Sequence, residues 1–183
     1  MRLKQNHVQY ISRKISKDLV NCDFIEIRST KEAIAEQVAI IMTADIKKES
    51  VLDEAVANLL DNQEDDIEFY KADYRQLFWM TKKRMANEYG VNLNNSERFS
   101  DIAHQILDFL YEEDFIHFTV NDNQVKNVII ESIENFMSGF DDADSAAYEK
   151  IKNYQRKLIP GTDDYNDIFN RLYEEELVRR GLI

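Results

Sequence analysis

Two short stretches decide the fold: residues 21–30 read NCDFIEIRST, and residues 114–122 read DFIHFTVND. The tripeptide Asp-Phe-Ile occurs in both, at 23–25 and again at 114–116, so the two copies lie 91 positions apart. Each copy follows one run of apolar residues at helical spacing and precedes another such run. Recurrence of a segment in the same context is the pattern of an internal repeat.

An offset of 91 aligns the chain with itself without a gap and gives 13 identical pairs. Two amphipathic helical halves would share apolar stripes by chance, but the Asp-Tyr step at 73–74, repeated at 164–165, is not part of a stripe. We therefore predict two repeats, 1–91 and 92–183, that form one compact unit. The stripes coincide as well, with Ile11, Ile15 and Leu19 aligned to Ile102, Ile106 and Leu110.

Composition favours helices, because four glycines and one proline are too few for the turns of a sandwich or barrel. The second helix of each repeat is expected at about 31–47 and 122–138, with Gly139 ending the later copy. Thr30 and Asn121 are suited to begin these helices. The sequence predicts a mainly α protein: two tandem four-helix repeats related by pseudo-two-fold symmetry, with a short two-stranded antiparallel ribbon between them.

The ribbon follows from the two Asp-Phe-Ile segments. A strand of four or five residues leaves backbone groups that need partners, so we expect Phe24–Arg28 to pair with Phe115–Thr119 across the two-fold axis. Phe24 and Phe115 are expected to anchor the ribbon on the helices, with Ile25 and Ile116 on the alternate side. These four residues are the predicted structural interface between the repeats.

A chain break is visible in only one repeat. The second repeat reads LIPGTDDY from residue 158, where proline and glycine interrupt the helical pattern and Thr162 or Asp163 can cap the next helix. The aligned letters from residue 67, IEFYKADY, contain no helix breaker. The repeat nevertheless predicts a bend or non-helical residues between Phe69 and Ala72.

Three features of the sequence indicate the cellular compartment: cysteine usage, the N-terminus and hydropathy. Cys22 is the single cysteine and fits a reducing environment. The first residues have no apolar signal-peptide core, and no stretch is long and apolar enough to span a membrane. A cytoplasmic protein is expected. The net charge of −12 divides into −2 for 1–91 and −10 for 92–183, which disfavours nucleic acid except at a local basic surface.

Motifs for catalysis or metal binding are not found. The three histidines and one cysteine offer no zinc pattern, and Asp101 near His104 is explained by a helix start. The acidic run from Asp141 fails the spacing of a calcium loop. Glycine-rich phosphate loops and nucleophile motifs do not occur. We expect no catalytic, cofactor-binding or metal-binding residues, and no enzyme.

Two surface features remain. Arg13 and Lys17 lie one turn apart on the first helix, opposite its apolar face, and Lys82, Lys83 and Arg84 follow one another in the last helix of the same repeat. Together they predict a basic interaction surface, although a solvated helix face gives the same pattern. Trp79 aligns with Asn170, so it marks either a contact particular to the first repeat or the edge of the core.

The chain resembles a known bacterial family, the domain of unknown function 507. The resemblance is carried by MRL at residue 1, DLV before CDFIEI, DYRQLF from residue 73 and YEEELVRRG at the end. Family members include chains about one repeat long, so the resemblance implies two tandem copies here. It implies no activity, ligand or catalytic residue. The second repeat lacks the basic start and has NLNN in its place.

Two functional hypotheses follow. The first is a non-catalytic helical interaction or scaffold protein with a protein partner. The alternative is a nucleic-acid-associated regulator that uses the basic face of residues 1–91.

Overall fold

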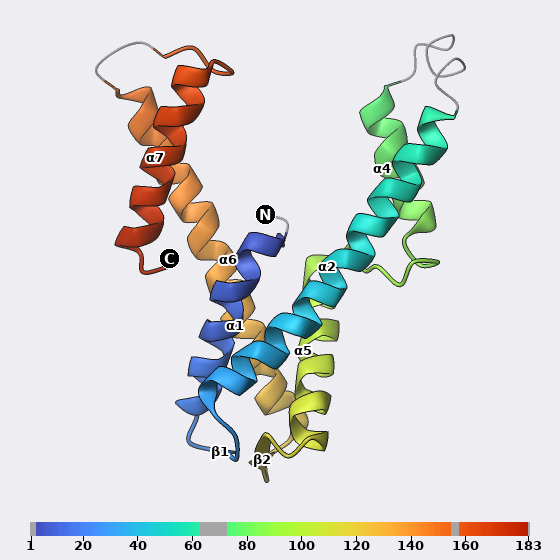
Figure 1. The fold of residues 1–183 in the computed structure, drawn as a ribbon, viewed down its shortest axis with the longest axis vertical. Helices are drawn as coiled ribbons and strands as arrows, with labels where there is room; N and C mark the ends of the chain where they lie inside the picture. Colours follow the sequence, from blue (N-terminus) through green and yellow to red (C-terminus); the bar gives the residue numbers. More distant parts are fainter. Residues whose placement is uncertain (1–2, 63–72, 155–157, 183) are drawn as a thin grey trace.

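The computed structural model describes residues 3–62, 73–154 and 158–182. Within these residues the protein is mainly α-helical, with one short antiparallel sheet (Figure 1). The elements, in chain order, are α1 (Gln5–Val20), β1 (Ile25–Ile27), α2 (Lys31–Asp61), α4 (Tyr74–Met85), α5 (Asn95–Glu112), β2 (Ile116–Phe118), α6 (Asp122–Lys152) and α7 (Asp163–Arg179). None of these helices is long and apolar enough to cross a membrane.

The helices form a base and two arms, so the molecule has the outline of a V (Figure 1). In the base, α1 and α5 pack against the first parts of α2 and α6. Beyond the base, α2 continues into one arm with α4, and α6 continues into the other arm with α7. Separate small cores fill the arms, built around Leu52 and Val56 in one and around Ala147 and Ile151 in the other.

The predicted ribbon is present: β1 and β2 pair antiparallel at the tip of the base. Glu26 pairs with His117, which is its own counterpart 91 positions later, and Ile27 pairs with Ile116. A local two-fold axis between Glu26 and His117 gives this register. The two strands begin at 25 and 116, and α2 and α6 begin at 31 and 122, so both pairs keep the offset of 91. The symmetry of the complete repeats stays a prediction.

Side chains of the ribbon alternate differently from the expectation. Ile25 and Ile116 face the helices and are buried, whereas Phe24 lies on the solvent side with 39% of its surface exposed. The prediction that Phe24 anchors the ribbon is therefore wrong, because Phe24 precedes the first paired residue of β1 and the buried side chain there is that of Ile25. Phe115 is half-buried and packs against Phe109, with ring centroids 6.0 Å apart.

The helix starts agree with the sequence. Thr30 Oγ1 accepts a hydrogen bond from Ala33 N at 3.1 Å, and Asn121 Oδ1 accepts one from Asn123 N at 2.9 Å. These caps satisfy amides that have no partner inside the helix. Thr162 caps α7 in the same way.

The predicted ends of the second helices, near residue 47 and at Gly139, are wrong. Both α2 and α6 are 31 residues long, so each continues past its predicted end. In α2 the buried stripe runs on through Glu49, Leu52 and Val56 without a breaker, so packing sustains the helix. Gly139 lies inside α6 and does not end it. A side chain at this position would crowd Leu182, because a Cβ there would lie 3.0 Å from Leu182 Cδ1. The predicted break at Phe69–Ala72 lies outside the described residues.

The ribbon gives a stability prediction. Ile116→Ala removes a side chain that is 1% exposed and should lower the free energy of unfolding by about 2–5 kcal/mol. Phe24→Ala should cost less, about 1 kcal/mol, because 39% of the Phe24 surface is already exposed in the folded protein. Urea denaturation followed by circular dichroism measures both, and equal losses would contradict the observed alternation.

Candidate functional site

A basic pocket of about 480 Å³ lies between α1, the start of α2 and the C-terminal residues. Five of its lining residues are cations and one is a carboxylate, in a chain whose net charge is −12. We call it the basic pocket, and it is lined by Tyr10, Arg13, Lys14, Lys17, Asp18, Lys31, Phe136, Arg180, Gly181 and Leu182. Such a concentration of positive charge favours an anionic ligand.

Helix α1 supplies one wall of the basic pocket. Residues 10, 13, 14 and 17 lie on one helical face because they are three or four positions apart. Lys14 Nζ pairs with Asp18 at 2.7 Å, and the same Asp18 oxygen accepts a hydrogen bond from Ser132 Oγ at 2.7 Å. Among the residues that the structure describes, Arg13, Lys17 and Lys31 have no ion-pair partner, so their charges remain available.

The C-terminal residues supply the opposite wall. Arg180 Nε lies 3.4 Å from Glu176 Oε2, and Arg180 Nη2 donates to the carbonyl of Asp142 at 3.4 Å. Glu176 also pairs with Lys150 at 2.7 Å and with Arg179 at 2.5 Å. These hydrogen bonds, led by that from Lys150, lower the pKa of Glu176 to about 2. The wall is therefore held by an ionised carboxylate.

The floor of the basic pocket is apolar. The rings of Tyr10 and Phe136 are nearly parallel, 15° apart, with centroids at 6.4 Å. Leu182 packs over Gly139 beside them, and its backbone N donates to the carbonyl of Leu177 at 3.0 Å. The pocket thus combines cations at its rim with apolar surface beneath.

The structure does not bring the predicted basic residues together. Arg13 and Lys17 line the basic pocket, whereas Lys83 and Arg84 are exposed on α4 in the arm (Figure 1). Lys82 is 1% exposed, so its assignment to an interaction surface is wrong. Sequence reasoning missed Lys14, Lys31 and Arg180. Lys14 was detectable from its spacing to Arg13 and Lys17, but Lys31 and Arg180 join the pocket only through the tertiary fold.

Lys82 belongs to a buried ionic junction where α2, α4 and α5 meet. Its Nζ lies 2.7 Å from Glu49 Oε1 and 2.6 Å from Asp53 Oδ1. Arg98 of α5 lies 2.6 Å from Glu49 Oε2 and 2.5 Å from Asp45 Oδ2. Glu49 therefore bridges the arm to the base. Burial alone would raise the pKa of Glu49, but the hydrogen bonds from Lys82 and Arg98 outweigh it and lower that pKa.

The equivalent positions of the other half form an aromatic junction. At an offset of 91, Asp45, Glu49, Lys82 and Arg98 correspond to Phe136, Phe140, Tyr173 and His7. The rings of His7 and Phe140 are 4.7 Å apart, those of Phe136 and Phe140 are 4.5 Å apart, and those of Phe140 and Tyr173 are 6.4 Å apart. Positions aligned at this offset thus form ion pairs in one half and ring contacts in the other.

His7 is buried in the aromatic junction. Its Nδ1 accepts a hydrogen bond from the backbone N of Lys4 at 3.3 Å, which requires that nitrogen to be unprotonated. Burial, followed by the charge of Lys4, lowers the pKa of His7 from 6.5 to about 4.

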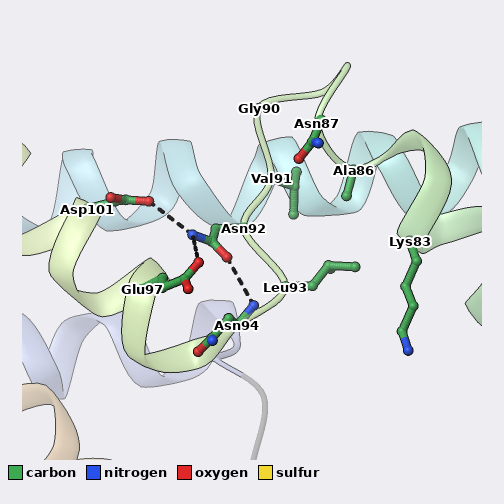
Figure 2. Close-up of a pocket in the computed structure, with 10 residues that line it drawn as sticks. All are labelled: Lys83, Ala86, Asn87, Gly90, Val91, Asn92, Leu93, Asn94, Glu97 and Asp101. Atoms are coloured by element: carbon green, nitrogen blue, oxygen red, sulfur yellow. Dashed lines mark hydrogen bonds between the residues drawn. The ribbon is translucent and has the colours of Figure 1, made fainter.

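A second pocket, of about 470 Å³, lies between the end of α4 and the start of α5 (Figure 2). Asn92 Nδ2 donates to Glu97 at 3.1 Å and to Asp101 at 3.4 Å, and Asn94 N donates to Asn92 Oδ1 at 3.0 Å. Figure 2 shows these groups turned toward one another, so Asn92 already occupies the facing carboxylates of Glu97 and Asp101. Lys83 is its single cationic lining residue.

A family model described as protein of unknown function matches residues 1–182, which includes both halves. The chain belongs to the DUF507 family. No curated relative matches this DUF507 protein. The family match does not address whether the chain holds two tandem copies, which stays a prediction.

Metal-ligand types do not cluster in the part of the DUF507 chain that the structure describes: no group of three or more His, Cys, Asp or Glu side chains there is placed to hold an ion. Trp79 is 48% exposed on α4, and Lys82 Nζ lies 5.3 Å from the centre of its ring. Trp79 therefore lies at the edge of the ionic junction.

The ionic junction gives a stability prediction. Lys82→Ala removes the buried cation that Glu49 and Asp53 share, leaving Glu49 with Arg98 alone, and should lower the free energy of unfolding by about 3–5 kcal/mol. Lys83→Ala, the exposed neighbour, should change it by less than about 0.5 kcal/mol. Urea titration of both variants tests this, and a small loss for Lys82→Ala would show that the junction contributes little.

His7 gives a pH prediction. Because the pKa of His7 falls from 6.5 to about 4 on folding, the unfolded chain binds the extra proton between these values, and stability should decrease as pH falls through this window. The decrease assigned to His7 is at most about 3 kcal/mol. In His7→Phe the slope between pH 6.5 and 4 should flatten relative to the native protein. Identical slopes in thermal melts would refute the assignment.

Proposed function

We propose that this protein is a non-catalytic interaction protein that binds an acidic segment of a partner protein in the basic pocket. The observation that carries the proposal is the gathering of five cations around the apolar floor of the basic pocket. These cations are Arg13, Lys14, Lys17, Lys31 and Arg180. Carboxylates of a partner would pair with the rim, and an apolar side chain would cover Tyr10 and Leu182. A cytoplasmic setting is part of the proposal.

The shape of the molecule supports an interaction role. The chain exposes 11564 Å² at a mass of 21.6 kDa, whereas a compact globular protein of that mass exposes about 9,000 Å². The excess is larger than the roughly 800 Å² that each partner buries in a standard protein–protein interface. A two-armed fold with this much surface is suited to holding a partner.

The alternative is a nucleic-acid-associated regulator that uses the same cations. A peptide is favoured because the positive surface is short. Asp18 lies within the basic pocket, and Glu32 and Glu36 line the surface beside it. A long polyanion would approach these carboxylates, whereas a short acidic segment fits between them. Phe136 is buried and is not a surface for base stacking.

A charge-reversal pair tests the proposal. A fluorescent peptide of alternating Glu and Leu should bind the native protein and weaken with rising salt. Arg13→Glu with Lys17→Glu should reduce affinity at least about tenfold, because two unpaired rim cations become repulsive. The matched control, Lys83→Glu with Arg84→Glu, changes the same residue types on the exposed face of α4 and should stay within about twofold.

The measurement is fluorescence anisotropy, with single-stranded RNA as a parallel ligand. Equal loss in both charge-reversal pairs, or no peptide binding by the native protein, would contradict the proposal. Tighter and steeply salt-dependent RNA binding would support the nucleic-acid alternative instead.

A further inference from the structure

The basic pocket does not end at Lys31. A second hollow, of about 430 Å³, shares Arg13 and Lys31 with it and continues between α1 and α2 past Ala35 and Ala39. A third, of about 440 Å³, shares Ala39 with the second and reaches Lys47. The three hollows share lining residues and follow one another along α2, and we call this stretch of surface the α1–α2 groove.

The floor of the α1–α2 groove is formed by small side chains. Ala35 and Ala39 are one turn apart on α2, and Ala44 continues the floor beside Ile40, whose side chain is 56% exposed. Small side chains let another backbone approach closely, and exposed Ile40 offers apolar contact. From Lys31 to Lys47 the groove follows about 24 Å of helix.

Charge is distributed unevenly along the groove. Five cations, including Arg13, Lys17 and Arg180, gather at one end, Lys47 is a single cation at the other end, and Glu32 and Glu36 line the middle. A partner with acidic side chains along its whole length would meet these carboxylates. Complementarity therefore requires acidic residues at one end of the partner and apolar residues over the middle.

Backbone chemistry selects the conformation of the partner. The groove is lined by helices throughout, by α1 and α2 in its first two hollows and by α2 in the third, and their backbone amides and carbonyls already pair within each helix. An extended peptide would find no strand edge to pair with, whereas a helix satisfies its own backbone. We infer that the α1–α2 groove binds an amphipathic helix of about 16 residues, acidic at one end and apolar along one face. This inference rests on the proposed function and specifies its partner.

The test uses peptides of 16 residues. One has an acidic first turn and an apolar stripe at helical spacing, the second has the same composition in scrambled order, and the third carries a central proline. The first should bind and gain helical circular dichroism, and the other two should bind at least about tenfold more weakly.

Variants of α2 localise the helix. Ala44→Trp places a bulky ring in the groove from an exposed position and should weaken the helical peptide at least about tenfold. Asn58→Trp puts the same ring on an exposed part of α2 outside the groove and should leave binding unchanged. Ala39→Leu fills the centre of the groove and should act like Ala44→Trp. Should Ala39→Leu fail to fold, Ala44→Trp alone decides.

The outcomes separate the two proposals. Equal binding of all three peptides, or native affinity in Ala44→Trp, overturns the helix-in-groove inference. If the helix-in-groove inference fails but Arg13→Glu with Lys17→Glu still abolishes binding of the acidic peptides, the proposed recognition of acidic segments stands. If no acidic peptide binds the native protein, the proposed function falls and the inference falls with it.

Discussion

A single constraint organises the molecule: each of the two 31-residue helices has to bury one continuous apolar stripe against two different sets of partners. In α2 the stripe from Ile34 to Ile46 packs in the base, and its continuation through Leu52 and Val56 packs against α4. Because each helix runs unbroken from the base into an arm, each arm is a helical continuation of the base. The V shape follows from this continuity (Figure 1).

The two arms meet the base through chemically different junctions. The buried Glu49 is shared by Lys82 and Arg98, and these cations offset the cost of burying its charge. The counterpart at Phe140 is stabilised by ring packing with His7 and needs no charge. If α4 and α7 exchanged places, the carboxylate of Glu49 would be buried against an aromatic ring. The difference therefore favours one arrangement of α4 and α7 over its exchange.

Sequence reasoning located what depends on local pattern. The caps at Thr30 and Asn121 could be predicted because each rests on neighbouring residues, and the pairing of the two Asp-Phe-Ile segments could be predicted because the same letters recur in the same context. It failed at Gly139, where the decisive contact is Leu182, 43 positions away. It also failed at Phe24, because two consecutive apolar residues in a strand do not reveal which one faces the core.

The candidate site divides in the same way. Arg13 and Lys17 were accessible as a helical spacing, whereas Arg180 reaches the basic pocket only after α7 folds back on α6. Lys82 was misassigned because adjacent cations in a helix point in different directions, about 100° apart, and only the tertiary structure shows which one is buried.

The strand pairing also determines which parts of the chain can fold while it is being synthesised. β1 has its hydrogen-bonding partner 91 residues later, and α1 packs on α6, so the first half is synthesised before the partners of its ribbon and base exist. At roughly 5–20 residues per second, the nascent first half waits about 5–20 s with an unpaired strand and an open apolar face. During translation, the α1–α2 hairpin is therefore the earliest unit that can form, and closure of the base is a late, non-local event.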